Sequence, residues 1–139
     1  WATSRDEAKR ARAVEIGAHE AFEPGARLPS RVDAVIETVG KATWSHSIRS
    51  LKPGGTIVVC GATSGDATAA ELQRVFFLQL RVVGSTMGTR DELERLVQMC
   101  TVTGVRPVVD QVLPLEQARD GFARMLDGDV FGKVVFTRD

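Results

Sequence analysis

The 139-residue sequence has no excess of either charge and no long apolar run. Eighteen Lys and Arg residues balance eighteen Asp and Glu residues, so no strong field would draw the chain to nucleic acid or to an anionic membrane. The uncharged stretches are well short of the roughly 20 residues that a membrane-spanning helix needs, and no basic segment leads into an apolar run at the N-terminus. We therefore expect a soluble, cytoplasmic protein with no nucleic-acid or membrane partner.

Side chains that bind metals or carry out nucleophilic catalysis are also scarce. The two cysteines, Cys60 and Cys100, form no Cys-x-x-Cys pair and have no histidine at ligand spacing, so we expect both to be reduced core residues. His19 and His46 are each isolated, which favours packing or surface roles over catalysis. The motifs GxSxG, HExxH and GxxxxGK[ST] are absent, which argues against a serine hydrolase of that type, a zinc protease and a P-loop NTPase.

Strand-like and helix-like runs alternate along the chain. Ser4 and Glu7 have the spacing of a capping box, which predicts a helix over residues 5–16 that stops at Gly17. Thr89 and Glu92 repeat this spacing ahead of a second helix, which is expected to close at Gly104. The other expected elements are strands at residues 1–3, 19–22, 32–38, 56–60, 80–84, 108–113 and 133–137, and helices at residues 41–51, 72–76, 90–103 and 115–126. This alternation predicts an α/β fold, a parallel sheet covered by helices.

Two of the expected strands end in small residues. They are VDAVIETVG at residues 32–40, whose apolar run suits a strand covered on both faces, and LKPGGTIVVCGATSG at residues 51–65. Pro53-Gly54-Gly55 should end the preceding helix, and residues 56–60 should form the central strand. In open α/β sheets ligands bind outside the carboxyl ends of strands, where small residues let a cofactor approach the backbone. These two strand ends are therefore the most ligand-like places in the sequence.

Five runs, in this order, cover nearly the whole chain. They are ATSRDEAKRARAVEIGAHEAF, VDAVIETVG, LKPGGTIVVCGATSG, FFLQLRVVGSTMGT and VLPLEQARDGFARMLDGDVFGKVVF. Together they resemble the cofactor domain of the medium-chain dehydrogenase/reductase superfamily, with the quinone oxidoreductase and zinc-type alcohol dehydrogenase branches closest. The resemblance implies a Rossmann-type sheet and an oxidoreductase that transfers hydride between NADPH and a quinone, an enone, an aldehyde or an alcohol.

Members of this superfamily carry further parts ahead of the segment that matches Trp1. These are a GroES-like catalytic domain, which would hold any zinc ligands, then the first Rossmann strand and its glycine-rich turn. In the sheet order 3-2-1-4-5-6 that strand is central, and strands lie about 4.8 Å apart, so its absence would leave a gap of roughly 10 Å. Unpaired backbone on both sides of a gap is not viable. We hypothesise that residues 1–139 are a truncated dinucleotide-binding domain, with a return segment from about residue 107, or that a partner chain supplies the pairing.

The resemblance also implies where the adenosine end of the cofactor binds. Ser4, Arg5 and Lys9 match the positions at which NADP-using relatives bind the 2′-phosphate, which favours NADP over NAD. Asp6 and Glu7 lie close by, Ser4 is also expected to cap a helix, and a solvated helix face is the alternative interpretation of Arg5 and Lys9. No catalytic residue is assigned, because the groups that contact substrate belong to the catalytic domain.

The resemblance implies that short segments, each following a strand, contact the rest of the cofactor. Val39 and Gly40 would lie near the adenosine and ribose, with a tight turn as the alternative. The other implied contacts are Gly61 and Ala62 at the nicotinamide ribose, Ser85 and Thr86 at the nicotinamide carboxamide, and Phe131, Gly132 and Lys133 in a stretch that returns over the cofactor. Simple packing is an equal alternative for Phe131.

Residues 80–84 are expected to form an edge strand. An exposed apolar edge needs cover, and in this superfamily the equivalent strand commonly pairs with its copy across a two-fold axis. A homodimer is therefore expected.

Alternative interpretations come from other functional classes. The junction at residues 51–59 is also typical of methyltransferases that use S-adenosylmethionine, but the C-terminal run of residues 114–135 has no place in that fold. Short-chain dehydrogenases need a catalytic tyrosine, and the sequence has none. A catalytically inactive nucleotide-binding or dimerisation fragment remains a third interpretation.

Overall fold

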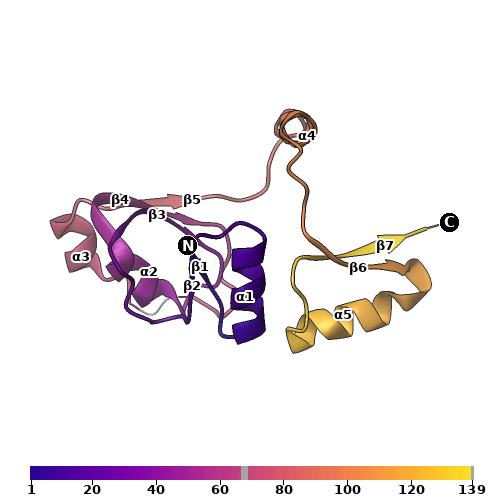
Figure 1. Ribbon diagram of the computed structural model, residues 1–139. Coiled ribbons are helices and arrows are strands. Elements are labelled where there is room, and N and C mark those ends of the chain that lie inside the picture. Colours follow the sequence, from indigo (N-terminus) through magenta and orange to yellow (C-terminus); the bar gives the residue numbers. More distant parts are fainter. Residues whose placement is uncertain (67–68, 139) are drawn as a thin grey trace. The chain divides into compact units, whose positions relative to one another are not determined.

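The computed structural model describes residues 1–66 and 69–138. The chain divides into two compact units, Trp1–Met87 and Gly88–Asp139. Strands and helices alternate through both units (Figure 1). The first unit contains β1 (Ala2–Thr3), α1 (Glu7–Glu15), β2 (Ala21–Phe22), β3 (Val32–Glu37), α2 (Trp44–Ser50), β4 (Leu51–Val59), α3 (Leu72–Phe77) and β5 (Arg81–Gly84). The expected α/β class is confirmed, because every pair of hydrogen-bonded strands is parallel.

The first unit holds two separate parallel sheets. One has the order β3-β4-β5, so the β-branched run of β4 is its central strand, as the sequence predicted. The other pairs only β1 with β2, and Trp1 packs edge-on against Phe22 beside it, with ring centroids 5.6 Å apart. Within the described residues no hydrogen-bonded ladder joins β1 to β3.

The core of the first unit lies between the three-stranded sheet and two helices. Ile48 of α2, with Leu51 and Ile57 of β4, is fully buried, and Leu80 completes the cluster just before β5. Trp44 packs against this cluster from α2, as Val75 does from α3. Full burial of such an aliphatic side chain stabilises the fold by about 1.5–3 kcal/mol. The cluster therefore fixes α2 on the sheet and sets the direction in which the carboxyl ends of its strands point.

The first helix begins differently from the prediction. Asp6, not Ser4, is its N-cap residue, and the Asp6 carboxylate accepts a 2.9 Å hydrogen bond from the backbone N–H of Lys9. The Ser4 hydroxyl accepts from the Asp6 N–H instead, at 3.2 Å. The predicted capping box of Ser4 and Glu7 is therefore wrong. The reason is local: a carboxylate three residues before Lys9 also satisfies the orphan N–H groups of the first turn.

Three further expectations about β3 and β4 are wrong. Pro53-Gly54-Gly55 does not end a helix but lies inside β4, where the register against β3 shifts and Lys52 forms an ion pair with Asp33 at 2.9 Å. Cys60 follows β4 and is exposed. Ile36 of β3 is 67% exposed, so β3 is not covered on both faces. The apolar runs were correctly identified as strands, but runs of this kind do not reveal whether a covering layer is present.

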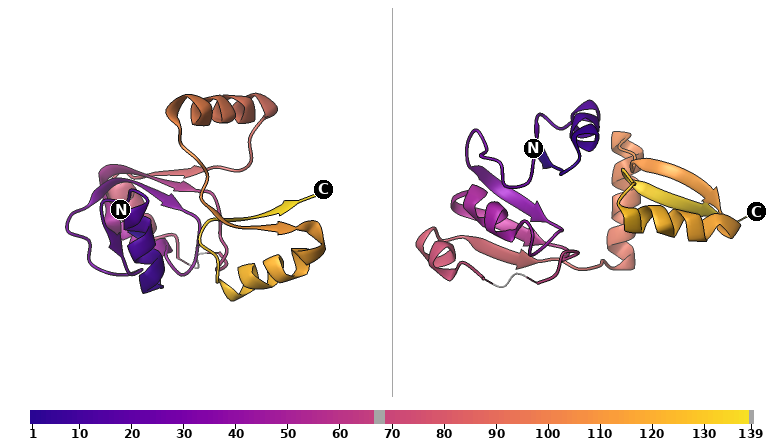
Figure 2. Two further views of the ribbon diagram at one scale, coloured as in Figure 1. Left: turned by 45° about the vertical axis from the view of Figure 1, so that its right-hand side comes forward. Right: turned by 90° about the horizontal axis from the view of Figure 1, so that it is seen from below.

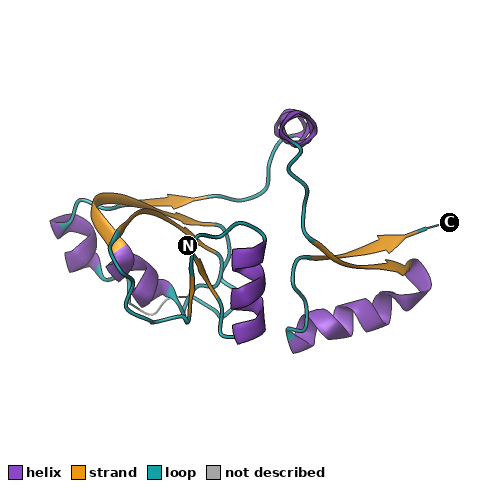
Figure 3. Cartoon of the chain, viewed as in Figure 1, coloured by secondary structure: helices purple, strands orange, loops and turns teal. Residues whose placement is uncertain are grey.

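The second unit contains α4 (Arg90–Thr103), β6 (Val109–Pro114), a 3-10 turn (Leu115–Gln117), α5 (Ala118–Asp127) and β7 (Lys133–Thr137). Thr89 and Glu92 form the predicted capping box at α4, which is confirmed. Helix α5 lies along the β6-β7 pair (Figures 2 and 3). Gly121 allows this approach, since a Cβ there would come within 2.7 Å of the Phe136 ring. None of the described helices is both long enough and apolar enough to cross a bilayer.

Two isoleucines on neighbouring strands test this description of the core. Ile57→Ala should lower the free energy of unfolding by about 2–5 kcal/mol, because it leaves a cavity in the buried cluster. Ile36→Ala, at an exposed position, should change it by no more than about 0.5 kcal/mol. Chemical denaturation of the chain measures both. Equal effects of the two substitutions would contradict the burial described above.

Candidate functional site

The carboxyl ends of the three parallel strands lie at one edge of the sheet. Val39 and Gly40 follow β3, and Gly61 and Ala62 follow β4. The segment after β5 begins with Ser85, whose backbone N–H donates to the Val59 carbonyl at 2.9 Å. Thr86 comes next and is exposed. The residues that the sequence assigned to the nicotinamide and ribose therefore share one edge, which is where open α/β sheets bind ligands.

Hydrogen bonds interlock the turns after β3 and β4. The Val39 carbonyl accepts from the backbone N–H of Ser64 at 2.8 Å and from its hydroxyl at 2.7 Å. The same hydroxyl accepts from the Ala42 N–H at 2.9 Å, and the Gly65 carbonyl accepts from the Lys41 N–H at 2.9 Å. The two turns consequently form one connected surface, although 20 residues lie between Gly40 and Gly61 in the sequence.

Both turns need glycine at their closest approach. Gly40 has φ of +87°, and a Cβ there would lie 2.6 Å from the Gly65 carbonyl oxygen and 2.9 Å from Ala62 Cα. At Gly61 a Cβ would lie 2.8 Å from the Thr38 carbonyl oxygen. Real Cβ atoms do not come so close to backbone, so a side chain at either position would push the turns apart. The alternative interpretation of Gly40 as a tight turn is therefore correct as a description of its backbone.

A buried carboxylate anchors the turn after β3. Glu37, the last residue of β3, is 3% exposed. Its Oε1 accepts from the Val39 N–H at 2.8 Å, the Gly40 N–H at 3.0 Å and the Thr43 hydroxyl at 2.7 Å, and its Oε2 accepts from the Ser47 hydroxyl at 2.5 Å. Burial raises the pKa of Glu37, but these hydrogen bonds outweigh it, and the pKa lies below its usual value. The carboxylate is therefore charged at neutral pH and accepts four hydrogen bonds.

The residues assigned to the adenosine end form a separate group at the start of α1. Arg10 holds this turn in place, because its guanidinium donates to the carbonyls of Ser4 at 2.7 Å and Arg5 at 3.1 Å. The Arg5 side chain is exposed. One carboxylate oxygen of Asp6 is engaged in capping the helix at the N–H of Lys9. The group thus presents cationic side chains around a fixed turn.

The predicted return segment lies in the second unit. The Phe131 N–H donates to Asp110 Oδ1 at 3.1 Å, and the Lys133 N–H donates to the Val108 carbonyl at 2.9 Å. Arg124 bonds the same Asp110 carboxylate at 3.2 Å and the Asp129 carbonyl at 2.8 Å. The backbone around Phe131 is therefore held by charged side chains of β6 and α5, and the Phe131 side chain is half-buried.

Sequence reasoning missed three residues that organise these groups. Glu37 could have been found, because it is the one charged residue at the end of an apolar strand. Ser64 stands among small residues, and a hydroxyl that bridges two turns leaves no periodic signal. Arg10 acts on carbonyls five and six residues earlier, which no local motif describes.

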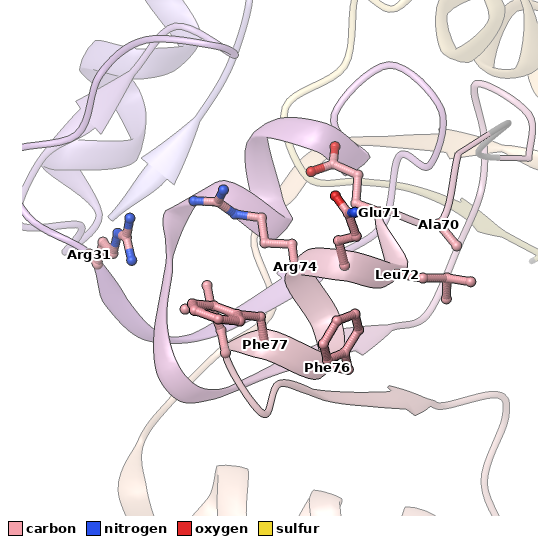
Figure 4. Close-up of a pocket in the computed structure, with 9 residues that line it drawn as sticks. Arg31, Ala70, Glu71, Leu72, Arg74, Phe76 and Phe77 are labelled. Carbon is pink, nitrogen blue, oxygen red and sulfur yellow. The ribbon is translucent and has the colours of Figure 1, made fainter.

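A cavity of about 940 Å³ lies elsewhere, on α3 (Figure 4). Leu72, Phe76 and Phe77 expose most of their side chains there, beside Arg74. None of the residues assigned to the cofactor lines this cavity. Within residues 1–66 and 69–138, no three His, Cys, Asp or Glu side chains come together as metal ligands would.

Comparison with known proteins decides the family. A family model for zinc-binding dehydrogenases matches residues 12–136. The chain belongs to the zinc-binding dehydrogenase family. The resemblance to the medium-chain dehydrogenase/reductase superfamily is thereby confirmed, as the relatives of this chain also indicate.

Two curated relatives are 31% identical to the chain over 76% of its length. They are an alcohol dehydrogenase of Geobacillus stearothermophilus and an acryloyl-coenzyme A reductase of Metallosphaera sedula. The chain spans only 31% and 32% of their respective lengths.

Solved structures give the same picture. A crystal structure of an NAD-dependent alcohol dehydrogenase matches 99% of the chain with a TM-score of 0.87 and 31% identity, and the match covers 43% of that protein. A cobalt- and zinc-bound alcohol dehydrogenase from Pyrobaculum aerophilum matches 98% of the chain with a TM-score of 0.84 and 27% identity, over 42% of its own length. The Rossmann-type fold of the chain is therefore shown.

Gly40 and Gly54 both have a left-handed backbone, but Gly40 also lies where the two turns meet. Alanine at each position therefore distinguishes the cost of conformational strain from the cost of disturbing the contact between the turns. Gly54→Ala, where φ is +76° and no atom lies within 4 Å of the added Cβ, should cost about 1–2 kcal/mol of stability. Gly40→Ala has the same strain and also meets Gly65 and Ala62, so it should cost about 1–3 kcal/mol more. Thermal unfolding measures the difference. Equal losses would show that the two turns are not in contact.

Proposed function

We propose that this chain is the NADP-binding part of an oxidoreductase that transfers hydride between NADPH and a small organic substrate. The observation that carries the proposal is the pair of interlocked turns after β3 and β4, at the carboxyl edge of the sheet in a member of the zinc-binding dehydrogenase family. The nicotinamide itself supplies the hydride chemistry, and the chain supplies position. An inactive nucleotide-binding or dimerisation fragment is the alternative for the chain on its own.

The turns offer backbone and small side chains where the nicotinamide half of the cofactor would lie. Gly61 and Ala62 leave room for a ribose, and Val39 and Gly40 place backbone against the sugar on the adenosine side. Ser85, with Thr86 after it, is held next to the end of β4 and would present backbone groups to the carboxamide. These contacts orient the ring and do not themselves transfer a proton.

The start of α1 favours NADP over NAD. A carboxylate that accepted from the ribose hydroxyls would favour NAD, whereas cations welcome a 2′-phosphate. Asp6 uses one carboxylate oxygen to cap α1, and Arg10 fixes the turn that carries Ser4 and Arg5. We therefore assign the 2′-phosphate to Ser4, Arg5 and Lys9.

The remaining assignments concern the second unit and the substrate. Phe131 and Lys133, on either side of Gly132, would cover the cofactor, on a backbone that Asp110 holds. The substrate is a quinone, an enone, an aldehyde or an alcohol, in keeping with the alcohol dehydrogenases and acryloyl-coenzyme A reductases among the relatives. Zinc, if the enzyme uses it, would be bound outside residues 1–139, and we expect the enzyme in the cytoplasm.

We further propose that a strand from outside residues 1–139 completes the sheet between β1 and β3. A groove of about 420 Å³ lies there, with Ala2 and Thr3 of β1 on one side and Ala34 and Ile36 of β3 on the other. The described residues provide neither strand with a partner on that side. Both walls of the groove carry unpaired backbone, and the β3 wall also exposes Ile36. Such a groove is suited to a parallel strand. The strand would come from a preceding dinucleotide-binding segment that accompanies a GroES-like catalytic domain, or from a partner chain.

The free edge of β5 supports a homodimer. Val82 and Val83 are 48% and 40% exposed, and the sheet order leaves β5 without an outer partner among the described residues. Such an apolar edge is a template for pairing. Pairing with the same strand of a second copy would extend the sheet across a two-fold axis.

Cofactor choice can be tested by calorimetric titration of NADPH and NADH. We expect NADPH to bind at least about tenfold more tightly, and Arg5→Ala to weaken NADPH by about tenfold while NADH is unchanged, since one charge-assisted hydrogen bond is lost. Arg12→Ala, which removes the same charge further along α1, should have no effect. Equal weakening of both nucleotides by Arg5→Ala would contradict the phosphate assignment. If a protein that contains both this chain and the strand that completes its sheet bound neither NADPH nor NADH, the proposed function would be refuted.

The edge strand can be tested by one backbone substitution. Ser85 donates to Val59 of β4, so the N–H of Val82, three residues earlier, faces outward. Val82→Pro removes that donor without breaking the ladder to β4 and should convert dimer to monomer in sedimentation velocity. Val82→Thr keeps both the N–H and the branched side chain, so it should remain a dimer. A dimer that survives the proline would place the interface elsewhere.

A further inference from the structure

Glu37 lies where the two turns of the proposed site meet, yet it faces the interior. It is 3% exposed, and its two carboxylate oxygens accept four hydrogen bonds. Two of these come from the backbone of Val39 and Gly40, and two from the hydroxyls of Thr43 and Ser47 on the α2 side. All four bonds come from groups of the chain itself, so we do not assign Glu37 as a contact of the cofactor.

The two backbone bonds determine the shape of the turn. They join the side chain of residue 37 to the N–H groups of residues 39 and 40. The turn is therefore held by bonds within residues 37–40 and not by bonds to a neighbouring strand alone. The Val39 carbonyl is consequently directed at Ser64, which accounts for the link to the second turn. Loss of the carboxylate would leave the N–H donors of the half-buried Val39 and the buried Gly40 without their partner.

The remaining two bonds connect this turn to the core. Thr43 precedes α2 and Ser47 lies within it, next to Ile48 of the buried cluster. Thr43 makes no side-chain cap bond to α2, so its hydroxyl is directed at Glu37 rather than at the helix. These two bonds therefore join the carboxylate to α2, whereas the two backbone bonds join it to the turn.

We propose that Glu37 is the positioning residue of the dinucleotide site, fixing the backbone of Val39 and Gly40 before the cofactor binds. The inference rests on the proposed function and adds to it a residue that touches neither cofactor nor substrate. It assigns separate roles to the hydrogen bonds. Those to Val39 and Gly40 set the affinity for the cofactor, and those to Thr43 and Ser47 support the stability of the fold.

The decisive variants change the carboxylate in two ways. Glu37→Gln keeps the size of the side chain but turns one acceptor into a donor, so it should raise the NADPH dissociation constant of the full-length protein by at least about tenfold. Glu37→Asp is shorter and still reaches N–H groups two and three residues ahead, as aspartate does in turns. It should therefore lie within about threefold of the unsubstituted protein in affinity, while its melting temperature falls.

A matched control removes only the hydroxyl partners. Thr43→Val combined with Ser47→Ala leaves the carboxylate and its backbone bonds in place. This variant should melt at a lower temperature, because the buried carboxylate loses two hydrogen-bond donors. It should still bind NADPH within about threefold of the unsubstituted protein, because the N–H groups of the turn keep their bonds to the carboxylate. If it lost as much affinity as Glu37→Gln, or if Glu37→Gln bound normally, the positioning role would be overturned. No NADPH binding by the unsubstituted protein would instead refute the proposed function.

A second measurement does not depend on whether Glu37→Gln folds. In the unsubstituted protein, amide hydrogen exchange at Val39 and Gly40 should already be slow without cofactor and should slow by less than about threefold at saturating NADPH. Slowing by more than about tenfold would mean that the cofactor, not Glu37, orders the turn, and would overturn the proposal.

Discussion

The ionised carboxylate of Glu37 accepts four hydrogen bonds at the end of β3, and the geometry of the carboxyl edge of the sheet depends on them. A buried carboxylate without such partners would be strongly unfavourable, and the same charge, fully bonded, fixes two backbone N–H groups in place. From that turn the bonds continue through Val39 to Ser64, so the segments after β3 and β4 behave as one surface. The buried cluster around Ile48 holds α2, which carries Ser47.

The other constraint on the fold is the backbone that the chain leaves unpaired. Among the described residues, β1 and β3 each have one partner, and Ile36 of β3 is exposed at the groove between them. The further strand proposed above would satisfy the hydrogen-bonding groups that line this groove. The groove and the Glu37 carboxylate lie next to each other, since Glu37 is the last residue of the strand that borders the groove. A strand in that groove would therefore bring its own carboxyl end next to the interlocked turns.

Much of the fold could be read from the sequence, and the failures have physical reasons. Long periodic runs predicted α4 and its capping box, and the β-branched run of residues 56–60 predicted the central strand. Asp6 displaced Ser4 as a helix cap because both are good caps, and only the folded turn selects between them. Small residues located the candidate site at Gly40 and Gly61. The bonds that organise it were not predictable, because they join Glu37, Ser64 and Arg10 to backbone groups whose positions only the tertiary structure sets.

The most direct test of the account is a two-dimensional amide NMR titration of the full-length protein with NADPH. The account predicts that the amide signals that shift most, beyond those of any residues outside this chain, are those of Val39, Gly40, Gly61, Ala62 and Ser85, together with those at the start of α1. Shifts confined to α3 and its cavity, or no shifts at all, would contradict the assignment of the carboxyl edge of β3, β4 and β5 as the dinucleotide site.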